Sequence, residues 1–164
     1  MAQSIRTDVA RLVEAMLSHG ANVNAKMEGG WTPLMWAVTN NYTQTVDVLL
    51  KQGACVNVPD DEGCTPLIYA AMRPASLDLV RLLLQHGSEV NAQDDIGCTA
   101  LQWAVASDAP VDVVTLLLTH GADPNLADNL DGTPLMRAQE WERRPDLVAL
   151  LKQYGAKEPR RPHE

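Results

Sequence analysis

The sequence predicts an all-α repeat protein, a solenoid of stacked helix-turn-helix units linked by β-hairpin-like loops. Two motifs that recur in phase along the 164-residue chain carry this prediction. In the first, a glycine shortly precedes Thr-Pro-Leu or Thr-Ala-Leu, and successive threonines are 33, 34 and 34 residues apart. In the second, a glycine is followed four residues later by asparagine, as in Gly87 to Asn91, and a weaker last copy is Gly155-Ala156.

The stretch that follows Asp60 shows which elements one unit is expected to form. Thr65 can cap free amides and Pro66 suits the first helical position, so a first helix should begin here and end near Arg73, before a proline. Apolar residues at helical spacing predict a second helix from about Leu77 to His86, which a glycine ends. An Asp-Asp-Ile-Gly turn then leads into the next unit.

The repeat divides the chain into one domain, residues 1–157, and a short tail, 158–164, that we expect to be disordered. The units are about 1–26 (partial), 27–59, 60–93, 94–127 and 128–157. Residues 8–19 match a second helix with too little chain before them for a first one, so either residues 1–6 form a shortened cap or the chain is a piece of a longer array. Lys152 replaces a leucine of the inner units, as a polar outer face of the last unit requires.

Composition narrows the class of partner and the compartment. The net charge of −8 argues against a nucleic-acid binder and suits a basic partner. Neither a signal peptide nor a membrane-spanning stretch is recognisable. Three cysteines, an odd number, indicate free thiols in a reducing compartment, and Cys64 and Cys98 are one repeat apart, too far for a disulfide. We therefore expect a monomer in the cytoplasm, or in the nucleus, that contacts neither nucleic acid nor membrane.

No pattern in the chain indicates catalysis or a bound cofactor. The sequence has no phosphate-binding glycine loop, no HExxH and no CxxC. The histidines His19, His86 and His120 recur at one repeat position, about one helix spacing apart, which is too far to share a metal ion. The recurring aspartates are expected to be turn formers whose side chains cap backbone amides: Asp60, Asp94 and Asp128. We expect a protein that is not an enzyme and holds neither metal nor cofactor.

The motifs Asp-Asp-Glu-Gly-Cys-Thr-Pro-Leu-Ile-Tyr-Ala-Ala (60–71) and Leu-Val-Arg-Leu-Leu-Leu-Gln-His-Gly (79–87) resemble the ankyrin repeat. The resemblance covers nearly all of residues 8–157 and implies an ankyrin solenoid. In that family a histidine after the Thr-Pro-Leu motif helps to tie neighbouring hairpins. Here its position is occupied by other residues, so the resemblance does not carry that tie over: Met35, Ile68, Gln102 and Met136.

The resemblance also implies that a partner lies in a concave groove formed by hairpin tips and first helices. It places Glu28, Gly29, Trp31, Asp61, Glu62, Cys64, Asp95, Ile96 and Cys98 on the tips. It places Trp36, Tyr69, Trp103 and Arg137 on the helices, with Asn40, Met72, Arg73, Ser107, Glu140 and Trp141 at the helix ends. The candidate partner-binding set is Trp31, Trp36, Tyr69, Met72, Arg73, Trp103, Trp141, Glu28, Asp61, Glu62, Asp95 and Ile96.

Aromatic side chains beside acidic tips suit a peptide groove, because aromatics give large rigid contacts and acids steer basic partners. The alternative is that the aromatics at positions 36, 69 and 103 replace leucine in the core of a chain without phenylalanine. Trp31 and Trp141 are expected to be exposed. The stretch from Thr32 to Ala37 is similar to ankyrin domains that bind proline-containing peptides.

The leading functional interpretation is a non-catalytic protein-binding module, an adaptor or scaffold that takes a basic or proline-containing segment of another protein. Two alternatives remain open at this point. One is a stand-alone inhibitor that covers the active face of an enzyme, and the other is a targeting domain cut from a larger protein. Fold does not decide between them.

Overall fold

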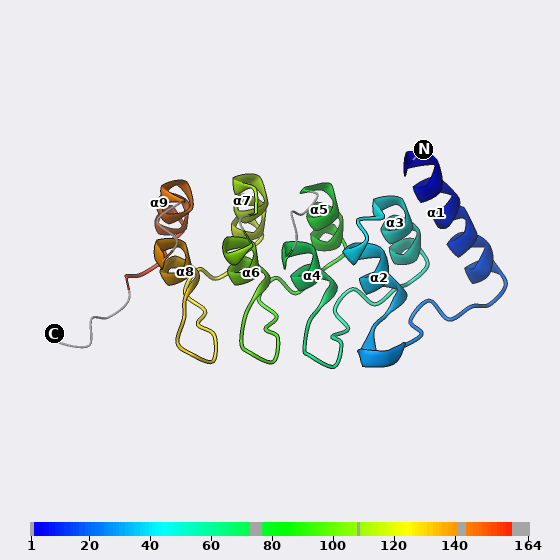
Figure 1. The fold of residues 1–164 in the computed structure, drawn as a ribbon, viewed down its shortest axis with the longest axis horizontal. Helices are drawn as coiled ribbons and strands as arrows, with labels where there is room; N and C mark the ends of the chain where they lie inside the picture. The colour runs from blue at the N-terminus through cyan, green and yellow to red at the C-terminus, as the bar shows by residue number, and fades with distance from the viewer. Residues whose placement is uncertain (1, 73–76, 108, 141–143, 159–164) are drawn as a thin grey trace.

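The computed structural model describes residues 2–72, 77–107, 109–140 and 144–158, with side chains from residue 9 onward. Over these ranges the chain forms α-helices and one short 3-10 helix, joined by loops (Figure 1). The helices are α1 (Ala2–Ser18), η1 (Glu28–Gly30), α2 (Pro33–Thr39), α3 (Thr43–Lys51), α4 (Pro66–Met72), α5 (Leu77–Gln85), α6 (Ala100–Ala106), α7 (Val111–Thr119), α8 (Pro134–Glu140) and α9 (Pro145–Gln153).

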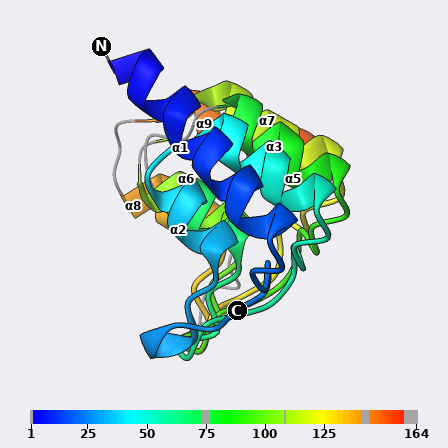
Figure 2. The same cartoon turned by 90° about the vertical axis from the view of Figure 1, so that its right-hand side faces the viewer.

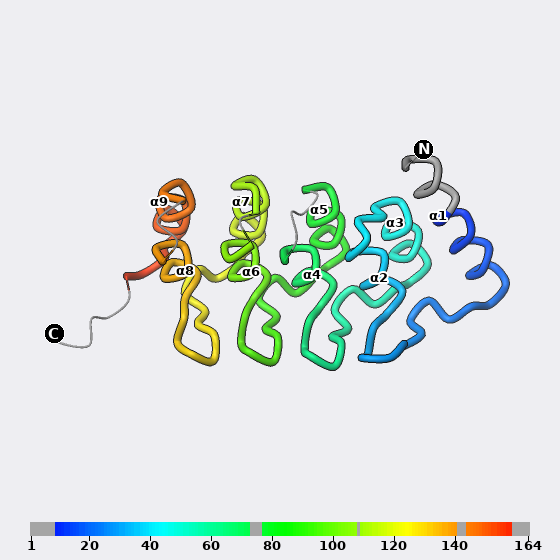
Figure 3. The backbone as a smooth tube through the Cα atoms, in the orientation of Figure 1, coloured from blue at the N-terminus to red at the C-terminus, as the bar shows by residue number. Residues whose placement is uncertain are grey.

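The helices stand in two parallel rows, and the hairpin loops extend to one side of both (Figures 1 and 2). The first helices of the units, α2, α4, α6 and α8, pack on one another in chain order. The second helices, α1, α3, α5, α7 and α9, form the other row in the same way. The smooth trace shows one elongated stack, with α1 and α9 at opposite ends (Figure 3). The predicted all-α repeat solenoid is confirmed.

The boundaries of the helices follow the capping residues that the sequence indicates. Thr99 Oγ1 accepts from the backbone N–H of Gln102 at 3.3 Å, and Gln102 Oε1 accepts from the backbone N–H of Thr99 at 2.9 Å, a reciprocal capping box. The glycine after α5, Gly87, has φ +83°, in the left-handed region that ends a helix at low cost. Predicted and observed bounds therefore agree within a residue or so.

The core lies between the two rows and continues from unit to unit. In each second helix of the later units, the side chain four residues before the closing glycine is fully buried against the first helix of the same unit. These residues are Leu49, Leu83, Leu117 and Leu151. Small residues such as Ala71 and Ala104 are also fully buried, which lets neighbouring first helices approach closely.

Asparagine side chains tie each unit to the next along the loops. Asn91 Nδ2 donates to the carbonyl of Gly121 at 3.0 Å, and its Oδ1 accepts from the N–H of Asp123 at 2.8 Å. The same pair of bonds is made by the equivalent asparagines Asn24, Asn57 and Asn125. The asparagine of the second motif is therefore the residue that couples successive units.

The two ends of the stack differ. Residues 2–6 belong to α1, which runs unbroken to Ser18. At the other end Lys152 is exposed and pairs with Glu158 at 2.6 Å. Its leucine equivalents in the inner units are buried, so the prediction of a polar outer face holds at this position. Residues 159–164 of the expected tail lie outside the described residues.

Candidate functional site

A repeated aspartate organises each of the last three hairpins. Asp94 Oδ1 accepts from the backbone N–H groups of Ile96 at 3.2 Å and Cys98 at 2.8 Å. Asp60 and Asp128 accept from the equivalent amides of their own hairpins. The prediction that these aspartates are turn formers is confirmed.

The second carboxylate oxygen of each aspartate holds the side chain nine residues later, on the first helix. Trp103 Nε1 donates to Asp94 Oδ2 at 2.7 Å, and the Tyr69 hydroxyl donates to Asp60 Oδ2. In the last unit Arg137 fills the position and pairs with Asp128 at 2.5 Å. These three side chains are half-buried, and their polar groups are fixed by their own hairpins. Burial and the bond to Asp60 raise the pKa of Tyr69 well above its ordinary value.

Trp36 is the exception in this series. Met27 takes the aspartate position of the first hairpin, and a thioether is at best a weak acceptor. Trp36 is 42% exposed and lies edge-on to Tyr42, with ring centroids 5.4 Å apart. The alternative that Trp36 replaces leucine in the core is therefore wrong. Tyr69 and Trp103 pack against the core yet keep part of their surface exposed.

The structure corrects the expected exposure of Trp31. Its side chain is partly buried because it packs on Tyr69 of the next unit, with ring centroids 5.0 Å apart. Trp141 and Arg73 lie outside the described residues. Among the remaining helix-end candidates, Asn40 and Glu140 are exposed. Ser107 Oγ donates to the carbonyl of Ala71 at 2.9 Å, a hydrogen bond between neighbouring units.

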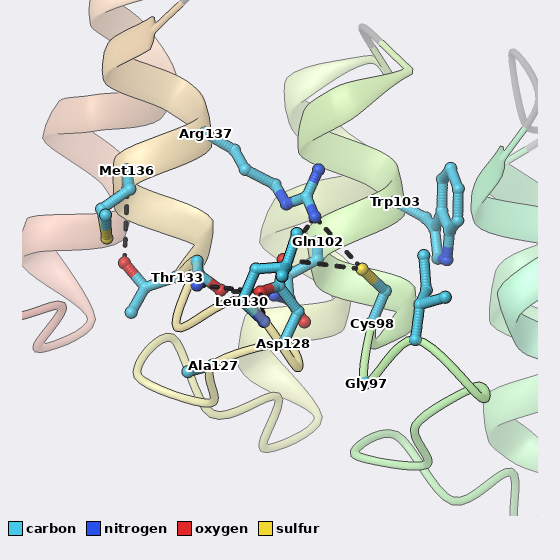
Figure 4. A network of polar contacts seen from close by, with 12 residues as sticks. Gly97, Cys98, Gln102, Trp103, Ala127, Asp128, Leu130, Thr133, Met136 and Arg137 are labelled. Carbon is cyan, nitrogen blue, oxygen red and sulfur yellow. Dashed lines mark hydrogen bonds and ion pairs between the residues drawn. The ribbon is translucent and has the colours of Figure 1, made fainter.

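Cys64 and Cys98 are not surface residues of the hairpin tips, which corrects the placement that the resemblance implied. Both are buried because the next hairpin covers them. Cys98 Sγ faces Asp128 Oδ2 at 3.9 Å and accepts from an Arg137 guanidinium N–H at 3.2 Å (Figure 4). Burial, with the negative charge of Asp60, raises the pKa of Cys64 to about 12. All three cysteines are free thiols, and Cys55 is exposed.

Gln102 links neighbouring hairpins at the position where the ankyrin family usually has a histidine. Its Nε2 donates to the carbonyl of Gly132 in the following hairpin at 2.8 Å (Figure 4). The side chain is fully buried and its other end makes the capping box with Thr99. The amide thus joins the third and fourth units where the family's histidine would stand.

A pocket of about 350 Å³ lies between the second and third hairpins and their first helices. Met72 and Trp103 on the helices are half-buried, whereas Glu62 and Asp95 on the hairpins are exposed. Ile96, on the third tip, is 54% exposed. The pocket therefore combines apolar walls with an acidic rim. Its lining residues are Glu62, Cys64, Met72, Asp94, Asp95, Ile96 and Trp103, and we call it the hairpin pocket.

The structure brings five of the predicted partner-binding residues together in the hairpin pocket. Glu28 on the first tip and Asp61 on the second are exposed as well, and backbone bonds fix successive tips to one another. The N–H of Asp61 donates to the carbonyl of Gly29, and the N–H of Asp95 to that of Glu62, each at 3.0 Å. The acidic side chains are consequently held in a row along the hairpins.

Leu130 is a surface residue that the sequence analysis missed. It is 91% exposed on the fourth tip, beside the third tip that carries Ile96. Its repeat position is that of Glu62 and Ile96, so alignment of the four tips could have identified it. At this repeat position the side chain thus changes from acidic in Glu62 to apolar in Ile96 and Leu130, while Asp131 beside Leu130 is also exposed.

The described part of the chain shows no grouping of three His, Cys, Asp or Glu side chains that could hold a metal ion. Two of the recurring histidines bond locally: His19 Nδ1 lies 2.7 Å from the Ala15 carbonyl, and His120 Nδ1 lies 2.8 Å from the Leu116 carbonyl. Within the described ranges, no helix has the length and apolar character needed to cross a bilayer.

Stacked helix-turn-helix units with projecting hairpins and a repeated Thr-Pro-Leu cap define a class of helical repeat protein. A family model for ankyrin repeats (3 copies) matches residues 2–94 and 76–161. The chain belongs to the ankyrin-repeat family. Ankyrin repeats are generally protein–protein interaction modules, and the family is typically non-catalytic. No curated protein sequence matches the chain significantly.

Proposed function

We propose that this protein is a non-catalytic adaptor that binds a basic, extended segment of another protein at the hairpin pocket. The observation that carries the proposal is the composition of that pocket, with Glu62 and Asp95 on its rim beside Trp103 and Met72 in its wall. Its free cysteines fit a reducing compartment, so we place its action in the cytoplasm or nucleus, as a monomer.

The pocket suits the side chain of lysine or arginine in two ways. The long aliphatic stem of either residue packs on apolar walls while its charged end stays at a polar rim. Arginine can also stack on an indole face. Here Trp103 and Met72 offer the wall, and the carboxylates of Glu62 and Asp95 offer the counter-charge. Because Asp94 holds the indole of Trp103, little of its freedom is left to be lost on binding.

The row of tips extends the site along a segment longer than one residue. Exposed acids at Glu28 and Asp61 continue the negative charge toward the first unit, and these acids would speed encounter with a basic partner. On the other side the exposed side chains of Ile96 and Leu130 offer apolar contact. The segment that fits carries basic residues at one end and apolar residues, proline included, at the other.

A second candidate function is inhibition of an enzyme by covering its active face. The specific observation in its favour is that Ile96 and Leu130 stand outside the first-helix row, on adjacent tips where a folded surface can reach them. An adaptor should bind short peptides from its partner, whereas a face-covering inhibitor should require the folded target. Comparing a target with its own peptides therefore separates the two functions.

The test is selection from a peptide library, followed by affinity measurement with charge-reversed variants. The pair Glu62→Lys and Asp95→Lys removes the rim, and the pair Asp78→Lys and Asp112→Lys makes the same change of net charge on the exposed second helices α5 and α7. We expect selected peptides to be rich in lysine and arginine. Loss of the rim should weaken them at least tenfold, because two close charge pairs are lost.

The control pair should retain nearly wild-type affinity at the same salt concentration. Equal weakening by both pairs would mean that only the net charge attracts the peptides, and the hairpin pocket would lose its assigned role. Retention of binding by the rim variant would contradict the proposal directly. Binding that falls steeply with salt in the wild type and weakly in the rim variant is the further result expected.

A further inference from the structure

Arg137 on α8 has more hydrogen-bond donors than its repeat position uses elsewhere in the stack. The equivalent residues on α4 and α6 are Tyr69 and Trp103, and each offers one donor, which is bonded to an aspartate of its own hairpin. One donor is therefore enough to hold a hairpin to its first helix. Arginine brings three nitrogens with five N–H groups to the same position.

The hairpin uses only one of these three nitrogens. Nη2 of Arg137 pairs with Asp128 at 2.5 Å and donates to Cys98 Sγ at 3.2 Å. Nε is buried without a partner among the described residues, and Nη1 bonds to none of them but is not buried. The side chain is 29% exposed, and Nη1 points away from both Asp128 and Cys98 (Figure 4). The tie to the hairpin thus leaves the Nη1 donors available at the surface.

The guanidinium lies on the side of α8 that faces the third unit. Its contact with Cys98 of the third hairpin fixes it there (Figure 4). Trp103, at the same repeat position one unit earlier, forms part of the hairpin pocket. Neighbouring packed helices are about 8–10 Å apart. Arg137 is accordingly about one helix spacing beyond Trp103, in the direction of the apolar fourth tip with Leu130.

The charge around Arg137 favours a neutral acceptor. Burial opposes its positive charge, but the bond to Asp128 and nearby negative charge, that of Glu140 included, outweigh burial and raise its pKa. The carboxylates of Asp128 and Glu140 already outnumber the guanidinium, so an incoming carboxylate would be repelled. An amide oxygen meets no such repulsion. An extended segment carries one at every residue, and the first helices use their own backbone groups internally.

We propose that Arg137 Nη1 donates to a main-chain carbonyl of the bound segment and thereby fixes the register of that segment along the stack. The inference rests on the proposed function, because it requires a segment whose basic residue occupies the hairpin pocket. An extended chain advances about 3.3 Å per residue, so one helix spacing corresponds to about three residues. The carbonyl bound by Arg137 therefore lies about three residues from the basic residue, at the apolar end of the segment. Proline is compatible with this contact, because it lacks an N–H but keeps its carbonyl.

The stack itself supplies a matched replacement for the test. Arg137→Trp installs the residue that α6 has at this position, where Nε1 bonds to the equivalent aspartate at 2.7 Å. The variant should keep one donor for Asp128 and lose Nη1. Arg137→Tyr copies α4 in the same way and repeats the test if the indole disturbs the fold. Urea midpoints of both variants measure whether the hairpin stays attached.

The probe is a blocked peptide with one central arginine among alanine and proline residues. A set of derivatives replaces one peptide bond at a time by an ester, whose carbonyl is a weaker acceptor, on both sides of the arginine. We expect the ester about three residues from the arginine to weaken binding to the wild type about three- to tenfold. Arg137→Trp should bind the parent peptide more weakly, and this ester should not weaken it further. An ester also removes the next N–H, but that loss is the same in both proteins, so their difference reports on Arg137.

Two results would overturn the role of Arg137 while leaving the proposed function intact. One is that every ester has the same effect on the wild type and on the folded Arg137 variants. The other is that these variants bind the parent peptide as tightly as the wild type. Failure of the proposed function looks different: the wild type does not bind the arginine peptide, or Glu62→Lys with Asp95→Lys binds it unchanged. Either outcome would contradict binding at the hairpin pocket, and the inference would fall with it.

Discussion

The bond between Trp103 and Asp94 can be tested by a change of one atom. Asp94→Asn keeps one oxygen for the amides of Ile96 and Cys98, but it turns the acceptor of the Trp103 indole N–H into an NH₂ group. Donor then faces donor. If the amide rotates instead, the two backbone bonds of the turn lose their acceptor. Either orientation leaves a buried donor unsatisfied.

The magnitude follows from the charge of the acceptor and the burial of the site. Asp94 is buried, and a hydrogen bond to a charged group contributes about 1.5–3 kcal/mol to the free energy of unfolding. We therefore expect Asp94→Asn to lower that free energy by about 1.5–3 kcal/mol. The neighbouring Asp95 is exposed, and Asp95→Asn should change it by no more than about 0.5 kcal/mol.

The assay is urea-induced unfolding followed by far-ultraviolet circular dichroism, for wild type and both variants. Trp103→Phe, alone and with Asp94→Asn, completes a double-mutant cycle. The two changes should be non-additive by about 0.5–3 kcal/mol, because either one alone removes the same bond. Equal midpoints for Asp94→Asn and Asp95→Asn, or full additivity in the cycle, would refute the reasoning that hairpin aspartates hold the first-helix side chains.

Three further predictions concern pH, thiol reactivity and two glycines with positive φ. Burial opposes ionisation of Asp128, but the N–H groups of Gly132 and Leu130 and the Arg137 guanidinium outweigh it and lower its pKa. The stabilisation by the charged Asp128 is therefore present above about pH 4 and is lost as the pH falls through the lower pKa of the folded state. Asp128→Asn should flatten the fall of the urea midpoint between pH 5 and 2, and an unchanged slope would contradict this. Iodoacetamide at pH 8 should alkylate Cys55, which is exposed, and should not alkylate Cys64 and Cys98, which are buried, until urea unfolds the protein. Mass spectrometry of the labelled protein measures this, and rapid labelling of all three cysteines in the native protein would contradict the prediction. Gly87 and Gly97 have similar φ values of +83° and +81°, but a Cβ on Gly97 would lie 2.6 Å from Asn129 Oδ1, while one on Gly87 meets nothing within 4 Å. Gly87→Ala should lower the free energy of unfolding by about 1–2 kcal/mol, and Gly97→Ala should lower it by about 1–3 kcal/mol more. Equal urea midpoints for the two variants would contradict close packing of the hairpins.

Short-range pattern was enough to derive the architecture. The spacing of Thr-Pro-Leu motifs, the caps such as Thr99 and the closing glycines such as Gly87 all act within a few residues of chain, so their effect can be read without knowing the neighbours in space. The same locality explains why the aspartates of the turns were identified correctly. Acidic tips could also be listed, because the repeat assigns each residue a position in the unit.

The sequence pattern did not predict the contacts that side chains make with neighbouring units, because these contacts involve residues about 30 positions away in the chain. Cys64 and Cys98 have tip positions by alignment, yet the next hairpin buries them. Trp31 was expected in solvent and lies on Tyr69. The coupling by asparagines such as Asn91, and the tie by Gln102, likewise exist only once the units are stacked.

The exposed faces follow the same rule. Trp36 and Trp103 have one repeat position and one residue type, but only Trp103 has an aspartate nine residues before it and a preceding helix beside it. Trp36 faces the open end of the stack and keeps 42% of its surface in solvent. Sequence periodicity therefore assigns the architecture and the position of a residue within its unit, because these depend on local backbone preferences. The stack decides which of those positions is buried, because burial depends on which neighbouring unit is present to cover it.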